Sequence, residues 1–405
     1  MSHVLIIGAG HAGANAAAML RQSGFAGEVT LISEEAVLPY QRPPLSKAWL
    51  KGETSSEALA LRPASFYEKS NVTLRLSSRA QAIDRAAKVV VLEGGERIAY
   101  DKLIIATGAR ARRLPLAGAD SPSVHELRNV ADADRLKAGL AAAKRIAIIG
   151  GGYIGLEVAA SARALGVDVV ILEREARVLA RVANPLLSGF FTDYHRARGV
   201  EIRTGVEIAG FDVDGDRFNG VRLADGSLVA ADCALVGVGA IPNDELARAA
   251  GLKCELGVCV DEVARTSDAD IYAIGDVTWR PLPLYQRHGR LESVPNALEQ
   301  ARMVAADIAG KPLPAGDVPW FWSDQYDLKL QIAGLAFGDE SIIVRGDPAS
   351  AKFALFHLDG GVVRAVEAVN SPAEFMAAKP WILAGKAVDP QRLADVSIPI
   401  KEVAP

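Results

Sequence analysis

One arrangement of residues occurs twice in this chain and limits its possible folds more than any other feature. The apolar run His3–Ile7 is followed by the loop Gly8-Ala9-Gly10-His11-Ala12-Gly13, an alanine-rich stretch, a second apolar run and then Glu34. The same order returns between Arg145 and Glu173, around the loop Gly150-Gly151-Gly152-Tyr153-Ile154-Gly155. Each copy has the pattern strand, glycine loop, helix, strand and acid. The sequence therefore predicts two βαβ units, each with parallel strands.

The three glycines of each loop have separate physical tasks. The first permits a tight turn off the strand, the second lets backbone N–H groups approach a pyrophosphate, and the third allows the helix to pack closely on the strand. The acid after the second strand suits the hydroxyls of an adenosine ribose. Both copies have the correct flanking elements, so we predict two dinucleotide-binding folds. Their binding residues are Gly8, Gly10, Gly13 and Glu34 in the first fold, and Gly150, Gly152, Gly155 and Glu173 in the second.

Three other apolar runs end in small or acidic residues. They are predicted strands within 101–109, 233–238 and 270–274. In open α/β sheets, ligands bind at the carboxyl ends of the strands. We therefore expect the residues that follow these strands to face the nucleotides. They are Thr107, Gly108, Gly239, Gly275 and Asp276.

The texture of the sequence changes at Val318. Short strands and hairpins follow, interrupted by Asp359-Gly360-Gly361, and a helix-like segment covers Ala373–Leu383. This pattern predicts a separate α+β domain. We expect an α/β chain with two Rossmann-like domains and this C-terminal domain. The predicted boundaries are 1–110 with 242–317 for the first dinucleotide domain, 111–241 for the second and 318–405 for the last.

Composition argues against several classes of protein. Lys and Arg number 45 against 49 Asp and Glu, so the net charge of −4 gives no overall attraction to nucleic acid or an anionic membrane. No apolar run reaches the roughly 18 residues that span a bilayer, and the first one stops at Gly8. The three cysteines, Cys233, Cys254 and Cys259, form no C-x-x-C pair. We expect no disulfide framework, no metal site and a cytoplasmic location.

Four further segments carry a more specific pattern. They are Tyr40–Lys47, Gly150–Glu157, Glu292–Ala297 and Pro319–Gln325. Together with the two glycine loops, they resemble the FAD-dependent, NADH-oxidising ferredoxin reductases of the putidaredoxin reductase type, which serve cytochromes P450 and ring-hydroxylating dioxygenases. The resemblance implies a glutathione reductase-like fold and an enzyme, a ferredoxin–NAD⁺ reductase. In it, FAD accepts a hydride from NADH and passes single electrons to a [2Fe-2S] ferredoxin.

The resemblance also implies roles for residues around FAD. Lys47 would lie beside the isoalloxazine and stabilise negative charge on the reduced ring. Helical spacing from Ala297 predicts a helix that begins near Pro295, and its positive end would point at the flavin. The expected FAD contacts are Gly8, Gly10, Ala12, Gly13, Glu34, Arg42, Lys47, Ala80, Thr107, Gly108, Arg128, Asp276 and Val294.

The expected NAD contacts are Gly150, Gly152, Tyr153, Ile154, Gly155, Glu173 and Gly239. The Glu173 carboxylate would repel a 2′-phosphate and favour NADH over NADPH, although Arg174 and Arg177 are close enough in sequence to weaken that preference. Tyr153 resembles an aromatic residue that covers the flavin, the alternative being a loop side chain packed for shape. Glu157, expected in the first helical turn, is either an acceptor for the nicotinamide amide or an acid that offsets the helix dipole.

The family places a tryptophan at Trp322 beside the nicotinamide, whereas Trp320 is expected in the core. The predicted catalytic residues are Lys47, Tyr153, Glu157 and Trp322. Arg62 and Arg302 are candidates for docking an acidic ferredoxin. A rubredoxin reductase and an NADH-sensing flavoprotein like apoptosis-inducing factor are the alternatives. Flavin disulfide reductases need a thiol near residues 41–44, where this chain has none. The sequence leaves the oligomeric state and the terminal oxygenase open.

Overall fold

The computed structural model describes residues 2–215 and 217–404. Contacts divide the chain into two compact units, each made of three segments. The first comprises Met1–Gln41, Ser56–Arg110 and Ile241–Pro319. The second comprises Arg42–Ser55, Ala111–Ala240 and Trp320–Pro405. The expected three-domain boundaries remain a prediction.

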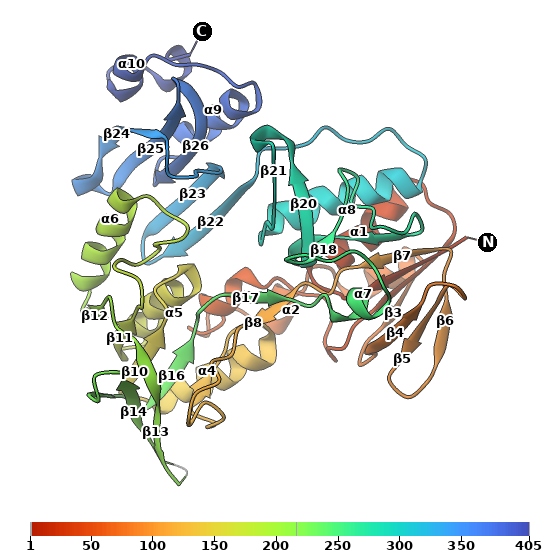
Figure 1. Ribbon diagram of the computed structural model, residues 1–405, viewed down its shortest axis with the longest axis horizontal. Coiled ribbons are helices and arrows are strands. Elements are labelled where there is room, and N and C mark those ends of the chain that lie inside the picture. Colours follow the sequence, from red (N-terminus) through yellow and green to blue (C-terminus); the bar gives the residue numbers. More distant parts are fainter. Residues whose placement is uncertain (1, 216, 405) are drawn as a thin grey trace. The chain divides into compact units, whose positions relative to one another are not determined.

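A parallel five-stranded sheet in the order β19-β7-β1-β2-β3 forms the centre of the first unit. Its strands are β1 (His3–Ile7), β2 (Glu28–Ile32), β3 (Val72–Arg75), β7 (Lys102–Ile105) and β19 (Ile271–Ala273). Val4 and Ile6 pack with the helices α1 (His11–Gln22) and α8 (Val294–Ile308), which lie against each other (Figure 1). Leu5 and Ile7 belong to the apolar cluster on the opposite face, because successive side chains of a strand alternate.

The opposite face of this sheet packs against a three-stranded antiparallel sheet, β4 (Ala80–Asp84), β5 (Val89–Leu92) and β6 (Arg97–Ala99). The remaining helices of the unit are α2 (Ser56–Leu59), α3 (Ala64–Lys69) and α7 (Glu245–Ala249), with short 3-10 turns at Gly275–Val277 and Pro283–Tyr285. A small sheet contains β18 (Val258–Cys259), β20 (Thr278–Leu282) and β21 (Arg287–Gly289). The chain passes between the units through β8 (Ala109–Ala111) and β17 (Ala240–Pro242).

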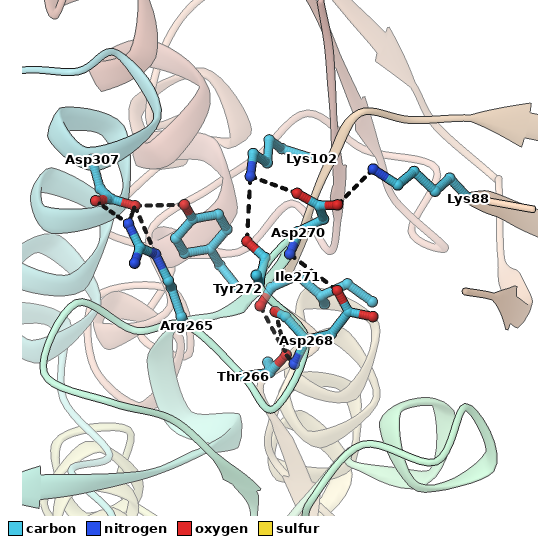
Figure 2. Close-up of polar contacts among 10 residues, drawn as sticks. Lys88, Lys102, Arg265, Thr266, Asp268, Asp270, Ile271, Tyr272 and Asp307 are labelled. Atoms are coloured by element: carbon cyan, nitrogen blue, oxygen red, sulfur yellow. Dashed lines mark hydrogen bonds and ion pairs between the residues drawn. The ribbon is translucent and has the colours of Figure 1, made fainter. Parts of the chain in front are cut away.

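Charged side chains bind the edge strand β19 to its neighbours (Figure 2). Asp307, near the end of α8, accepts hydrogen bonds from the Arg265 guanidinium at 2.6 Å and from the Tyr272 hydroxyl at 2.5 Å. Asp270, just before β19, accepts from Lys102 at 2.6 Å and from Lys88 at 2.5 Å. Burial opposes ionisation of Asp307, but these hydrogen bonds keep its pKa below the usual value. The network holds the strand that leads into Gly275-Asp276.

A second parallel sheet, in the order β12-β11-β10-β16-β9, forms the dinucleotide fold of the second unit. Its strands are β9 (Val124–His125), β10 (Arg145–Ile149), β11 (Asp168–Leu172), β12 (Val200–Arg203) and β16 (Cys233–Val236). Apolar side chains of β10 and β11 pack against an antiparallel sheet of β13 (Ile208–Asp214), β14 (Arg217–Leu223) and β15 (Leu228–Ala230). The helices are α4 (Val130–Ala142), α5 (Tyr153–Ala164) and α6 (Pro185–Arg196), and Pro43–Ser46 forms a 3-10 turn.

The C-terminal part of the second unit is an antiparallel sheet in the order β22-β23-β26-β25-β24 (Figure 1). Its strands are β22 (Trp320–Gln325), β23 (Leu328–Gly334), β24 (Ser341–Asp347), β25 (Lys352–Asp359) and β26 (Val362–Val369). The helices α9 (Pro372–Leu383) and α10 (Pro390–Ala394) pack against it, with 3-10 turns at Pro348–Ser350 and Ile400–Glu402. The expectation of two parallel sheets followed by an α+β region is confirmed.

Candidate functional site

The first glycine loop, residues 8–13, has backbone positions that leave no room for a Cβ, and we call such a loop a glycine cradle. Gly8 has φ +102°, and a Cβ there would lie 2.4 Å from the carbonyl oxygen of Ala106. A Cβ on Gly13 would lie 1.9 Å from the carbonyl oxygen of Gly8, so α1 approaches the strand at a distance only glycine allows. Gly10 is the N-cap of α1, and no side chain caps that end. A helix N-terminus without a side-chain cap, with its positive dipole end, suits the pyrophosphate of a dinucleotide.

The ends of the neighbouring strands meet this cradle. A Cβ on Gly275 would lie 2.9 Å from the Ala12 Cβ, which places the turn holding Asp276 against the start of α1. Thr107 donates its hydroxyl to the Asn243 carbonyl at 2.7 Å, and the Asn243 amide donates to the Thr107 carbonyl at 2.9 Å. Asn243 was not predicted from the sequence. Glu34 follows β2, is exposed, and lies 3.8 Å from the Arg79 guanidinium.

The predicted helix near Pro295 is confirmed, and it begins at Val294. The Ser293 hydroxyl accepts from the N–H of Asn296, which is a standard N-cap. Gln300, on the same helix, is buried and accepts the N–H of Gly275 at 2.7 Å. This bond ties α8 to the turn of Asp276. Nothing in the linear pattern marks Gln300, since its partner lies 25 residues away.

The second glycine loop repeats the geometry of the first. Gly150 has φ +101°, and a Cβ on Gly155 would lie 2.2 Å from the Gly150 carbonyl oxygen. Gly152 caps α5 without side-chain help, and a Cβ there would meet nothing within 4 Å. Glu173 Oε2 accepts from the Gly151 N–H at 2.6 Å. The acid at the end of β11 thus lies directly beside the loop, as a ribose-binding carboxylate must.

The two arginines after Glu173 differ in their availability. The Arg177 guanidinium donates to the carbonyls of Ala180 and Ala183 and to the Ser188 hydroxyl. Arg174 is exposed and pairs with Glu175 at 3.0 Å. Arg177 is therefore committed to the following loop, which leaves Arg174 as the cation that could receive a 2′-phosphate.

Lys47 and Glu157 form an ion pair at 2.6 Å between Nζ and Oε2. Lys47 also donates to the Pro43 carbonyl at 3.0 Å, and the Ser46 hydroxyl donates to the same carboxylate oxygen at 2.5 Å. Glu157 is the fifth residue of α5, so its expected place in the first turn was wrong. Its carboxylate binds side chains instead of the free N–H groups of the helix end, which removes the dipole-offsetting interpretation.

Arg42 and Arg128 lie together in the same unit. The Arg42 guanidinium donates to the Arg128 carbonyl at 2.7 Å. The Arg128 N–H donates to Asp132, which closes a capping box with Asn129 at the start of α4. The structure thus places the predicted Arg42 and Arg128 side by side on a rigid support.

The predicted aromatic residues lie on opposite faces of β22. Tyr153 is half-buried and packs edge-on against Phe321, with 4.8 Å between the ring centroids. Its hydroxyl donates to the Val182 carbonyl at 3.3 Å. Burial raises the pKa of Tyr153 well above its usual value, so it stays a neutral phenol. Trp322 lies on the face of β22 opposite to Phe321 and contacts Trp320, with 5.7 Å between the ring centroids. Trp320 is half-buried on Phe375, so its expected place in the core was wrong.

The other predicted residues have the following positions. Ala80 begins β4 and is partly buried, Ile154 is exposed in the first turn of α5, and Gly239 has φ +102° after β16. Arg62 donates to Asn15 at 2.8 Å and covers the Phe66 ring, and burial lowers its pKa. Arg302 is exposed on α8.

The structure of residues 2–215 and 217–404 gives little evidence for a metal site or for a reactive thiol. No group of three His, Cys, Asp or Glu side chains there could hold a metal ion. The three cysteines are free thiols, and burial raises the pKa of Cys233 to about 12 and that of Cys254 to about 11. Across the same residues, no helix has both the length and the apolar character needed to cross a bilayer.

Two family models match the chain. The model described as pyridine nucleotide-disulphide oxidoreductase matches residues 2–301, and the model described as reductase C-terminal matches residues 320–404. The second model therefore covers the antiparallel sheet and the helices α9 and α10.

Individual relatives match over nearly the full length. A probable ferredoxin reductase of Castellaniella defragrans is 49% identical over 99% of this chain and 98% of its own. The ferredoxin–NAD⁺ reductase component of the p-cumate 2,3-dioxygenase system of Pseudomonas putida is 40% identical over 100% and 99%. The crystal structure of a covalent putidaredoxin reductase–putidaredoxin complex matches with a TM-score of 0.96 at 43% identity, over 99% of this chain and 97% of that one.

Proposed function

Because this chain belongs to the pyridine nucleotide-disulphide oxidoreductase family, among relatives named as ferredoxin reductases, we propose that it is an NADH-dependent ferredoxin reductase. It uses FAD and NAD(H) and transfers electrons to a [2Fe-2S] ferredoxin. That ferredoxin supplies a cytochrome P450 or a ring-hydroxylating dioxygenase.

One observation carries the proposal: the chain has two glycine cradles, each at the carboxyl edge of a parallel sheet and each with an uncapped helix N-terminus. Two such cradles give one chain a binding position for each of two dinucleotides, one an electron donor and the other an electron acceptor. The segment that would carry a redox thiol in a disulfide reductase, near residues 41–44, here has the sequence Gln41-Arg42-Pro43-Pro44. The chain therefore fits electron transfer without a protein thiol.

We propose the following roles for its residues. Gly8, Gly10, Ala12 and Gly13 receive the FAD pyrophosphate, while Glu34 and Asp276 bind its ribose and ribityl hydroxyls. Bound FAD supplies two-electron acceptance from NADH and one-electron release to the ferredoxin. Lys47 stabilises negative charge on the reduced flavin, and Glu157 holds the Lys47 ammonium in place. The remaining expected FAD contacts are Arg42, Ala80, Thr107, Gly108, Arg128 and Val294.

In the second fold, Gly150, Gly152 and Gly155 receive the NADH pyrophosphate and Glu173 its adenosine ribose. Ile154 and Gly239 border the same nucleotide. Tyr153 packs beside the nicotinamide path, and Trp322 lies on the acceptor-facing side. Of the two docking candidates, the exposed Arg302 is better placed to meet an acidic ferredoxin than Arg62, whose guanidinium is bonded to Asn15.

The test is NADH-dependent reduction of cytochrome c by the purified holoenzyme, with and without an added [2Fe-2S] ferredoxin. Strong stimulation by the ferredoxin supports the proposal. Stimulation by a rubredoxin alone would identify the acceptor as a rubredoxin, and a lack of stimulation by either would favour an NADH-sensing flavoprotein. We also propose a cytoplasmic location, in keeping with the three free cysteines; cell fractionation tests it.

A further inference from the structure

A row of buried polar side chains leads from α6 to the carboxylate of Glu157. His195 Nε2 lies 2.8 Å from Gln325 Oε1, and Gln325 Nε2 lies 3.1 Å from Ser323 Oγ. Ser323 Oγ lies 2.7 Å from Glu157 Oε1. At the far end, the Tyr326 hydroxyl lies 3.3 Å from His195 Nδ1. The row joins three elements, α6, β22 and α5.

The carboxylate sets the direction of every hydrogen bond in the row. An ionised Glu157 can only accept, so the single proton of Ser323 Oγ points at it. Ser323 must then accept from its other neighbour, and the Gln325 amide nitrogen faces it. The Gln325 oxygen therefore faces His195, whose Nε2 must carry the proton. His195 Nδ1 is left as an acceptor for the Tyr326 hydroxyl.

Burial strengthens this arrangement. His195, Ser323 and Gln325 are at most 1% exposed, so water does not compete for their donors. Burial also lowers the pKa of His195 to about 4, which keeps the ring neutral with one donor and one acceptor. All donors point toward Glu157, and hydrogen bonds aligned in this way polarise one another.

The register of β22 explains how the row reaches the ion pair. Alternate residues of a strand face opposite sides, so Ser323 and Gln325 share one face and Trp322 lies on the other. Ser323 occupies Glu157 Oε1, which leaves Oε2 for Lys47 and Ser46. The rotation of the Glu157 carboxylate, and with it the position of Lys47 Nζ, is thereby fixed.

We propose that Ser323 and Gln325 are positioning residues for the Lys47–Glu157 pair, with His195 as the anchor of the row. Their effect on flavin reduction rests on the proposed role of Lys47. The C-terminal sheet thus contributes to the active site through hydrogen bonds to a carboxylate of α5, in addition to its aromatic residues.

Stopped-flow reduction of the holoenzyme by saturating NADH tests the functional part. We expect Ser323→Ala to slow flavin reduction about tenfold, the usual scale for a hydrogen bond to a charged group, with FAD content unchanged. Ser323→Thr, which keeps a hydroxyl, should restore most of the rate, and Gln325→Met should give a smaller loss. Ser341→Ala, which removes a hydroxyl from β24 of the same sheet, is the matched control.

A double-mutant cycle separates positioning from general damage. In a Glu157→Gln background, Ser323→Ala should have almost no further effect, because its action passes through that carboxylate. An equal loss in both backgrounds, or full activity of Ser323→Ala, would overturn the proposal. If Lys47→Met also leaves flavin reduction unchanged, the proposed role of Lys47 fails instead.

The hydrogen-bond direction has a readout independent of activity. Nitrogen-15 NMR of histidine-labelled protein at pH 7 should show the His195 ring neutral with its proton on Nε2, assigned by loss of the signal in His195→Asn. A proton on Nδ1, or a charged ring, would contradict the row. This result stands whether or not Lys47 acts on the flavin.

Discussion

The carboxylate of Glu173 accepts a hydrogen bond from the backbone N–H of Gly151, with 2.6 Å between Oε2 and N. The negative charge is therefore held against the loop that would receive a nucleotide. Arg177, one of the two candidates for offsetting that charge, donates to Ala180, Ala183 and Ser188 instead.

We expect kcat/KM for NADH to exceed that for NADPH by at least about tenfold, the effect of ~1.4 kcal/mol of repulsion. Glu173→Ala should narrow the ratio, whereas Asp168→Ala, at the opposite end of β11, should leave it unchanged. Steady-state kinetics with both nucleotides measures the ratio. Equal values for the wild-type enzyme would exclude this role of Glu173.

Lys47→Met should slow flavin reduction by NADH and also destabilise the protein. It leaves Glu157 buried without its cation, which typically costs about 3 kcal/mol. The double variant Lys47→Met/Glu157→Gln should recover the thermal midpoint but not the rate. Lys51→Met removes a cation from an exposed pair with Glu53 and should change neither quantity. Recovery of the rate by the double variant would argue against a direct role for the Lys47 charge.

Trp322→Ala should slow NADH oxidation or electron output to the ferredoxin while FAD stays bound. The side chain is partly exposed and contacts Trp320, so its removal takes little from the core. Trp320→Ala should act mainly on stability, because Trp320 packs on Phe375. Stopped-flow kinetics and FAD absorbance separate the two effects. Unchanged kinetics in Trp322→Ala would refute the assignment.

Glycines of one loop should respond differently to alanine. Gly155→Ala places a Cβ 2.2 Å from the Gly150 carbonyl and should lower the thermal midpoint clearly. Gly152→Ala meets no protein atom within 4 Å and keeps an ordinary φ of −80°, so the protein should fold normally. Its methyl group would instead occupy the path of the pyrophosphate and raise KM for NADH about tenfold. An unchanged KM would mean that the nucleotide does not pass Gly152.

Asp307 should make stability depend on acid pH. Burial opposes its charge, yet the Arg265 and Tyr272 hydrogen bonds leave its folded pKa below the usual value. The stabilisation is therefore complete above the unfolded pKa of about 3.9 and disappears as pH falls through the lower folded pKa. Asp307→Asn should lower the thermal midpoint at pH 7 and flatten its decline below pH 4. Glu262→Gln, at an exposed residue, is the control. If the thermal midpoint of Asp307→Asn had the same pH dependence as that of the wild-type protein, the Asp307 network would not be the source of the acid sensitivity.

The predictable part of this protein lies in its local patterns. Both glycine loops, the strands that flank them and the start of α8 follow from spacing and backbone sterics, and the structure agrees with them. The acid expected in the first turn of α5 was misplaced because helix ends shift by a residue or two in any sequence-based prediction. The prediction that Trp320 lies in the core was wrong because the sequence of a strand does not show which of its two faces is buried.

The unpredicted residues are those whose partners are distant in the chain. Asn243 meets Thr107 across 136 residues, and Ser323 meets Glu157 across 166. Neither the identity of Asn243 or Ser323 nor its spacing from other residues in the sequence indicates such a partner. These contacts form only once the fold has brought separate segments together, so they are properties of the tertiary structure.

The hydrogen bonds between Thr107 and Asn243 join the points where the chain leaves the first unit and returns to it. During synthesis, β19 and α8 emerge from the ribosome after the whole second glycine-loop fold, although β19 is a strand of the first sheet and α8 packs against one face of it. The first unit is therefore begun before the fold inserted into it and completed after that fold. The glycine loop of this unit, where Gly275 lies beside Ala12, is complete only after residue 275 has been synthesised, so the proposed binding of FAD there must follow the synthesis of about two thirds of the chain.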